Sequence, residues 1–128
     1  MDRKAQMFMG TVFTGMGLAT MLFPKVTTEL SFSKTFLGKE GVTEPVKLVM
    51  RCFGSQATLC GLLILSSDFK ADTFRNFGLA IIPYFIFDIH YWRSGALTNF
   101  GAAGDAVGNI IFAACCLAGY STVKKKDA

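Results

Sequence analysis

Three ionisable residues stand out because they lie inside strongly apolar stretches of the sequence. Asp88 falls in FIFDIHYWRSG, near the end of one apolar run; Asp105 lies in FGAAGDAVGN, and Arg51 in VKLVMRCFG. Charged side chains within membrane helices are costly, at least ~2.5–3.5 kcal/mol on insertion scales, so they face the protein interior and mark functional sites by default. Two carboxyl groups in unequal environments can serve as acid and base. We therefore take Asp88 and Asp105 as the candidate catalytic residues.

Other polar residues at similar depth could bind or orient a ligand beside this pair. Arg51 would hold one carboxylate in its ionised form, while His90 precedes Tyr91 and Trp92 and also suits an aromatic belt at the membrane surface. A purely structural alternative uses the same residues, with Arg51 paired to both carboxylates to fix the packing of the helices. The candidate ligand-binding residues are Arg51, Gln56, Tyr84, His90 and Asn109.

Four apolar runs would position these residues. The chain of 128 residues is 52% hydrophobic and only 17% charged, and each run approaches the roughly 20 residues that a helix needs to cross about 30 Å of hydrocarbon. Helices satisfy their own backbone hydrogen bonds in lipid. We predict an all-α fold, an antiparallel four-helix transmembrane bundle in a single domain, with helices at about 6–23, 46–66, 74–93 and 100–120. The alternative is a soluble all-α protein, because the first and third runs contain polar residues.

The connections between these helices suggest how the runs are arranged. The links SDFKAD and RSGALTN are short, which favours antiparallel packing of sequential helices. The longer link after the first helix mixes phenylalanines and leucines with lysines, typical of either an interfacial segment or a solvated loop. At ~1.5 Å of rise per residue, Arg51, Asp88 and Asp105 should all lie about 7 Å inside the same membrane face. We therefore expect them to converge in the bundle interior.

Several other classes of site find no support in the sequence. The four cysteines lie in apolar runs without metal-ligand spacing, so they are either packing residues or a redox or quinone-linked thiol. The glycines of NFGAAGDAVGN follow no predicted strand, which argues against a dinucleotide site. The net charge of +4 comes from short clusters beside the helices and not from a basic patch. We expect no cofactor, no bound metal and no nucleic-acid partner.

Charge placement bears on the orientation and location of the chain. Basic residues flanking the helices slightly favour cytosolic termini. The sequence given ends in KKKDA, which resembles the dilysine retrieval signal of endoplasmic reticulum membrane proteins; the alternative is an ordinary basic flank. The first run lacks a small-residue cleavage site, so we expect it to be retained as a helix rather than removed as a signal peptide. The predicted location is the endoplasmic reticulum membrane.

The order of these elements resembles the small DoxX-like four-helix membrane proteins. The resemblance rests on the Leu-Phe-Pro that closes the first helix, RCFGSQATLCGLLIL in the second, Asp88 near the end of the third, and a glycine-rich fourth helix. The resemblance implies the four-helix fold. Some members of that group are linked to quinone or thiol chemistry, so the resemblance implies such chemistry less directly. Asp105 and Asn109 have no counterpart in that pattern.

Two main functions follow from these features. The first is binding or conversion of a lipophilic small molecule, such as a sterol, terpenoid, quinone or lipid, in an intramembrane polar pocket. The second is a non-enzymatic role as an accessory or scaffold subunit of a larger membrane complex. Transport is a weaker third choice, because four helices without an inverted repeat make a poor transporter. The expected partners are membrane lipid, a lipophilic ligand, and membrane proteins or further copies of this chain.

Overall fold

The computed structural model describes residues 2–127, and these residues are almost entirely helical. The described residues form six helices in succession, of which four are long and two are short. Within the described residues the only strand-like pairing is an isolated bridge between Phe32 and Leu97, so the predicted all-α fold is confirmed. The helices are α1 (Asp2–Leu22), α2 (Pro24–Ser31), α3 (Lys34–Leu37), α4 (Glu44–Ser66), α5 (Ala71–Arg93) and α6 (Asn99–Asp127).

The ends of these helices have local causes. Pro24 follows directly after α1 and begins α2, because proline cannot continue a helix but suits the first turn of the next one. Pro45 lies in the first turn of α4 for the same reason. The α5–α6 link turns at Gly95, whose φ of 77° favours glycine. The long helices begin one to four residues earlier than predicted, and α6 extends seven residues further.

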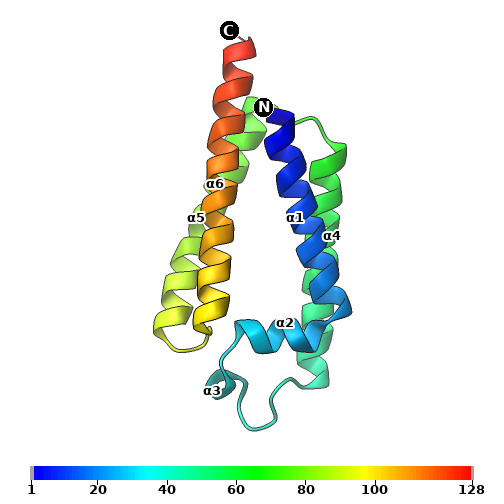
Figure 1. Ribbon diagram of the computed structural model, residues 1–128, viewed down its shortest axis with the longest axis vertical. Helices are drawn as coiled ribbons and strands as arrows, with labels where there is room; N and C mark the ends of the chain where they lie inside the picture. Colours follow the sequence, from blue (N-terminus) through cyan, green and yellow to red (C-terminus); the bar gives the residue numbers. More distant parts are fainter. Residues whose placement is uncertain (1, 128) are drawn as a thin grey trace.

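The four long helices pack as two antiparallel pairs rather than as a bundle of sequential neighbours. α1 packs along α4, α5 packs along α6, and the two pairs meet through α1 and α6. Figure 1 shows the pairs converging near the N-terminus and diverging toward the opposite end, which α2 crosses. The prediction that α4 and α5 pack as neighbours is wrong, although their link, residues 67–70, is as short as expected.

Glycines allow α1 to pack closely against α4. Gly17 lies against Gly54 and Thr58, and Gly61 lies against Gly10 and Thr14, so that an added Cβ at either position would come within 3.0 Å of the facing backbone. Small residues at such an interface let two helix backbones approach closely, which increases their van der Waals contact. The seven-residue spacing of these glycines on each helix places both contacts on one face.

A small core joins the two pairs near the end that carries the N-terminus. Met9, Ile64, Ile81, Phe112 and Cys116 are all buried there, one or two from each long helix. The ring of Phe13 stacks on that of Phe112 at 4.8 Å and meets the ring of Phe77 edge-on at 6.1 Å. Aromatic pairs in these geometries stabilise by about 0.5–1.5 kcal/mol beyond their area burial.

The opposite end is tied together by backbone hydrogen bonds between two links. Ser33 donates its amide hydrogen to the Ala96 carbonyl (2.8 Å), and Thr98 donates its amide hydrogen to the Ser31 carbonyl (2.9 Å). Gly101 allows the end of α2 to approach α6, because an added Cβ there would lie 2.5 Å from the Ser31 carbonyl oxygen. The end of α2 and the residues after it therefore hold the α5–α6 link in place, and this link joins the helices that carry Asp88 and Asp105.

Within residues 2–127, three helices are long and apolar enough to cross a membrane: α1 over Arg3–Leu22, α4, and α6 over Asn99–Lys126. Large apolar side chains are also exposed along all four long helices, including Phe53 on α4 and Ile86 on α5. Both findings are consistent with an integral membrane protein. α5 has 23 residues but is not among these three candidates, so the fourth membrane span remains a prediction.

Candidate functional site

The candidate site lies between α5 and α6, near the link that joins them. Asp88 lies five residues before the end of α5, and Asn109 lies on the facing side of α6. The side chain of Asn109 donates a hydrogen bond from Nδ2 to Oδ2 of Asp88 at 3.1 Å. Asp88 is only 4% exposed and Asn109 only 8%. This contact brings together a predicted catalytic residue and a predicted ligand-binding residue.

The second carboxylate oxygen of Asp88 is buried without a partner. Oδ1 accepts no hydrogen bond from any described residue. The Asp105 carboxyl group, one turn before Asn109 on α6, interacts directly with that of Asp88. Asp105 itself is exposed, unlike the interior position that we predicted. An unsatisfied buried acceptor costs about 1–3 kcal/mol.

Asp88 also lines an apolar groove on the surface of the α5–α6 pair. The groove has a volume of about 350 Å³. Its lining is mostly apolar, and it includes the indole of Trp92, which donates from Nε1 to Oδ1 of Asn99 at 2.9 Å. The groove therefore combines an apolar wall, an aromatic side chain held in place and one buried acceptor. Its lining residues are Asp88, Ile89, Trp92, Asn99, Ala102, Ala103 and Ala106.

The predicted convergence of Arg51 with Asp88 and Asp105 is wrong. Arg51 lies two turns into α4, and its side chain is exposed. α4 packs mainly against α1 and α2, and its residue in the small core shared with α5 and α6 is Ile64, near the other end of the helix. The ion pairs among the described residues are local ones, namely Lys25–Glu29, Lys47–Glu44 and Arg75–Asp72. The Arg51–Asp88/Asp105 network therefore does not form, and a role for Arg51 in ligand binding stays a prediction.

The other predicted ligand-binding residues lie apart from the groove lining. Gln56 is exposed on α4, whereas Tyr84 and His90 are exposed on α5. The His90 ring meets the Tyr91 ring edge-on at 5.0 Å, which fits the predicted aromatic belt. No described hydrogen bond or ion pair connects any of the three to Asp88, so their roles also remain predictions.

Sequence reasoning did not single out two polar residues of the groove. Trp92 had been assigned to the membrane surface, and Asn99 had been placed in the link before the fourth helix. Their seven-residue separation across a tight turn was the available signal, because it allows two side chains to meet on one side of a helical hairpin. The alanines at positions 102, 103 and 106 also line the groove, and their small size leaves room for a ligand.

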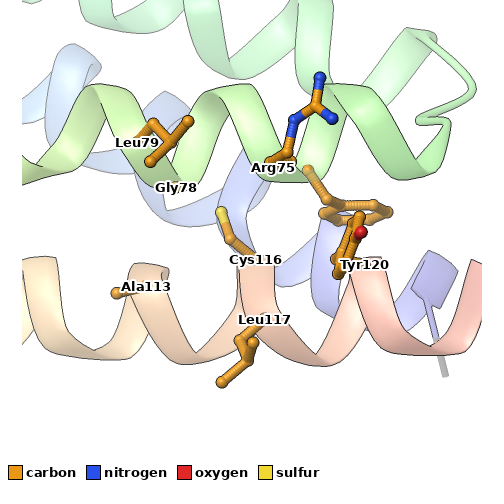
Figure 2. Close-up of a pocket in the computed structure, with 8 residues that line it drawn as sticks. Arg75, Gly78, Leu79, Ala113, Cys116, Leu117 and Tyr120 are labelled. Carbon is orange, nitrogen blue, oxygen red and sulfur yellow. The ribbon is translucent and has the colours of Figure 1, made fainter. Parts of the chain in front are cut away.

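A second groove at the other end of the α5–α6 pair has different chemistry. It also has a volume of about 350 Å³. Figure 2 shows Cys116 and Tyr120 projecting from α6 toward α5, with Arg75 at the groove's edge. The guanidinium of Arg75 is already paired with Asp72 at 3.1 Å. This groove has no buried polar atom without a partner among the described residues, and so we do not place the candidate site there.

The cysteines and acidic residues of the described chain do not form a metal cluster. Cys52 and Cys60 are exposed, Cys115 is half-buried and Cys116 is buried; all four thiols are free. No group of three or more histidine, cysteine, aspartate or glutamate side chains among the described residues could hold a metal ion. The chemistry available at the candidate site is therefore that of two carboxyl groups and an amide.

Comparison with protein families, with characterised proteins and with solved structures finds no match for this chain. The resemblance to the DoxX-like proteins is thus neither supported nor contradicted.

Proposed function

We propose that this protein binds a lipophilic small molecule in a membrane, in the groove beside Asp88. The observation that carries the proposal is the Oδ1 atom of Asp88, which is buried and accepts no hydrogen bond in the described chain. A ligand that donates to this atom would remove a cost of about 1–3 kcal/mol. The apolar lining would take up the rest of the molecule, as in most small-molecule sites.

Each residue of the site has a proposed role. Asn109 holds the Asp88 carboxylate in one orientation through its bond to Oδ2, leaving Oδ1 for the ligand. Asp105, whose carboxyl group interacts with that of Asp88, would exchange a proton with it. If the bound molecule is converted, these two carboxyl groups would act as acid and base. Sterols, terpenoids, quinones and other lipids are the ligand classes that we consider.

Native mass spectrometry of the gently solubilised protein tests this proposal. We expect wild-type protein to carry a bound small molecule that is lost from Asp88→Asn, since this substitution removes the charge but preserves the shape of the side chain. Asp68→Asn is the matched control, because Asp68 is exposed and outside the helices. Equal retention of the molecule by the wild type and Asp88→Asn would refute the proposal.

A second candidate function is that of an accessory subunit in a larger membrane complex. The observation that favours it is the exposed apolar face of α5, which includes Leu79, Ile82 and Ile86, on a helix that is not among the three candidate spans. A partner helix could cover this face. The same mass spectra test the idea: wild-type protein carrying other protein chains and no small molecule would favour the subunit role.

The location of the protein is a further proposal. Figure 1 places both described chain ends and the α4–α5 link at one end of the molecule. Arg3, Lys4, Lys70 and Arg75 belong to this end, as do the lysines of the last turn of α6. We propose that this end faces the cytosol and that the membrane is that of the endoplasmic reticulum, supported by the excess of basic residues expected on a cytosolic face.

A further inference from the structure

We infer that the ligand of the Asp88 groove is a lipophilic amine, an apolar molecule or lipid bearing a protonated amino group. This inference rests on the proposed function and narrows its ligand class. The starting point is the state of the Asp88 carboxylate. Oδ2 already accepts a bond from Asn109, whereas Oδ1 is buried and has no donor in the described chain. The ligand must therefore supply a hydrogen-bond donor.

The charge around Asp88 decides which kind of donor fits best. The nearest ionisable partner is a second carboxyl group, that of Asp105. A neutral hydroxyl group could donate to Oδ1 but would leave the two carboxyl groups without a counter-charge. A protonated amine would donate and would also place one positive charge beside the two carboxyl groups. Charge-assisted hydrogen bonds of this kind are roughly twice as strong as neutral ones.

Among the described residues, no cation pairs with Asp88 or Asp105. His90 and Arg93 follow Asp88 on α5, but both are exposed and neither forms an ion pair with Asp88 or Asp105 in the described chain. Arg51 belongs to the other helix pair. Buried charges in proteins are almost always paired, and a carboxylate within a membrane helix calls for a partner still more strongly. A cationic ligand supplies the missing partner.

The groove suits the remainder of such a molecule. Apart from Asp88 and Asn99 its lining is apolar or aromatic, and the amide oxygen of Asn99 is engaged by Trp92. The Trp92 indole offers an aromatic surface of the kind that attracts cations. The alanines of α6 leave space for apolar atoms. The groove thus offers one charged anchor and an otherwise apolar wall.

Matched probes that differ only in the donor group test the inference. The protein would be placed in phosphatidylcholine nanodiscs, which carry no net charge. Binding of 1-aminoadamantane would be compared with that of 1-hydroxyadamantane, and dodecylamine with dodecanol, by titration calorimetry. The adamantane pair represents a compact small molecule, and the dodecyl pair represents a lipid chain. Comparing the two pairs therefore distinguishes a small-molecule amine from a lipid amine as the ligand. Of the two amines, we expect the one that binds more tightly to bind wild-type protein about tenfold more tightly than the alcohol with the same apolar skeleton.

Three variants make the result specific to the site. Asp88→Asn should weaken amine binding by about tenfold or more and abolish the preference over the alcohol, while Asp68→Asn should behave as wild type. Asp105→Asn provides a second test if Asp88→Asn does not fold: because Asp105 is exposed, it should fold and should reduce the amine preference. Far-UV circular dichroism and gel filtration check folding.

The outcomes separate this inference from the proposed function. Alcohols that bind wild-type protein as tightly as amines, with both lost in Asp88→Asn, would overturn the amine class but leave the lipophilic site intact. Amine binding that is equal in all variants would overturn the inference as nonspecific partitioning. If no probe binds and native mass spectrometry shows no Asp88-dependent ligand, both the inference and the proposed function are wrong.

Discussion

Replacing Gly61 with alanine tests whether the close contact between α1 and α4 decides the arrangement of the helices. A Cβ at this position would lie 2.2 Å from Oγ1 of Thr14, 2.5 Å from the Thr14 backbone nitrogen and 2.8 Å from the Gly10 carbonyl oxygen. Gly15 is the matched control, because it lies on α1 and an added Cβ there meets nothing within 4 Å. Both variants make the same chemical change.

The expected magnitude follows from these contacts. The Thr14 side chain could rotate away from the new methyl group, but its hydroxyl would give up a hydrogen bond to the Gly10 carbonyl (2.8 Å), a loss of about 1 kcal/mol. The two backbone contacts cannot be relieved by rotation, so the helices must move apart. Overpacking of this kind costs about 1–3 kcal/mol. The gain in helix propensity, up to about 1 kcal/mol, occurs in both variants and cancels in their comparison.

Gly61→Ala should therefore be about 1–3 kcal/mol less stable than Gly15→Ala. The assay is unfolding in mixed micelles by titration with sodium dodecyl sulfate, followed by circular dichroism, with the free energy of unfolding obtained for each variant. Gly15→Ala should be as stable as wild-type protein or more so. Equal stability of the two variants would refute the reasoning, because it would show that α1 and α4 do not approach each other closely at Gly61.

Three further predictions concern the contacts that hold the links, and the location of the protein. Gln6→Leu should destabilise the protein by about 1–3 kcal/mol, because the buried Gln6 amide donates to the carbonyls of Ile64 and Ser67 and these acceptors would lose their donor. The control is Gln56→Leu at an exposed position, which should have little effect on the free energy of unfolding in the same titration. Thr98→Val should cost about 0.5–2 kcal/mol, because the Thr98 hydroxyl accepts the Gly101 amide hydrogen at 2.9 Å at the start of α6; Thr11→Val is its exposed control, and equal stability of the two would contradict the capping role. Joint replacement of Lys125 and Lys126 by serine should move a fluorescently tagged protein out of the endoplasmic reticulum, and unchanged localisation by microscopy would count against a retrieval signal.

The sequence by itself determined the helices and the matching positions of the two carboxyl groups along α5 and α6. Apolar runs of about 20 residues predict long helices because the pattern is local, and the prolines at 24 and 45 end or begin helices through their own backbone geometry. Counting residues from the helix ends placed Asp88 and Asp105 at one level, and the short α5–α6 link made them neighbours. Both carboxyl groups do interact in the structure.

The tertiary structure decided which helices pack together, and with that the composition of the site. Helical periodicity shows which residues share a face but does not identify the helix that the face contacts, since that choice depends on surface complementarity between distant segments. Gly17 and Gly61 allow α1 and α4 to approach closely, and this pairing takes Arg51 away from Asp88. Asp88 consequently lies beside Asn109 and Asp105, and no described residue donates to its Oδ1. This environment of Asp88 follows from the packing of α5 on α6, and the spacing of residues alone does not predict it.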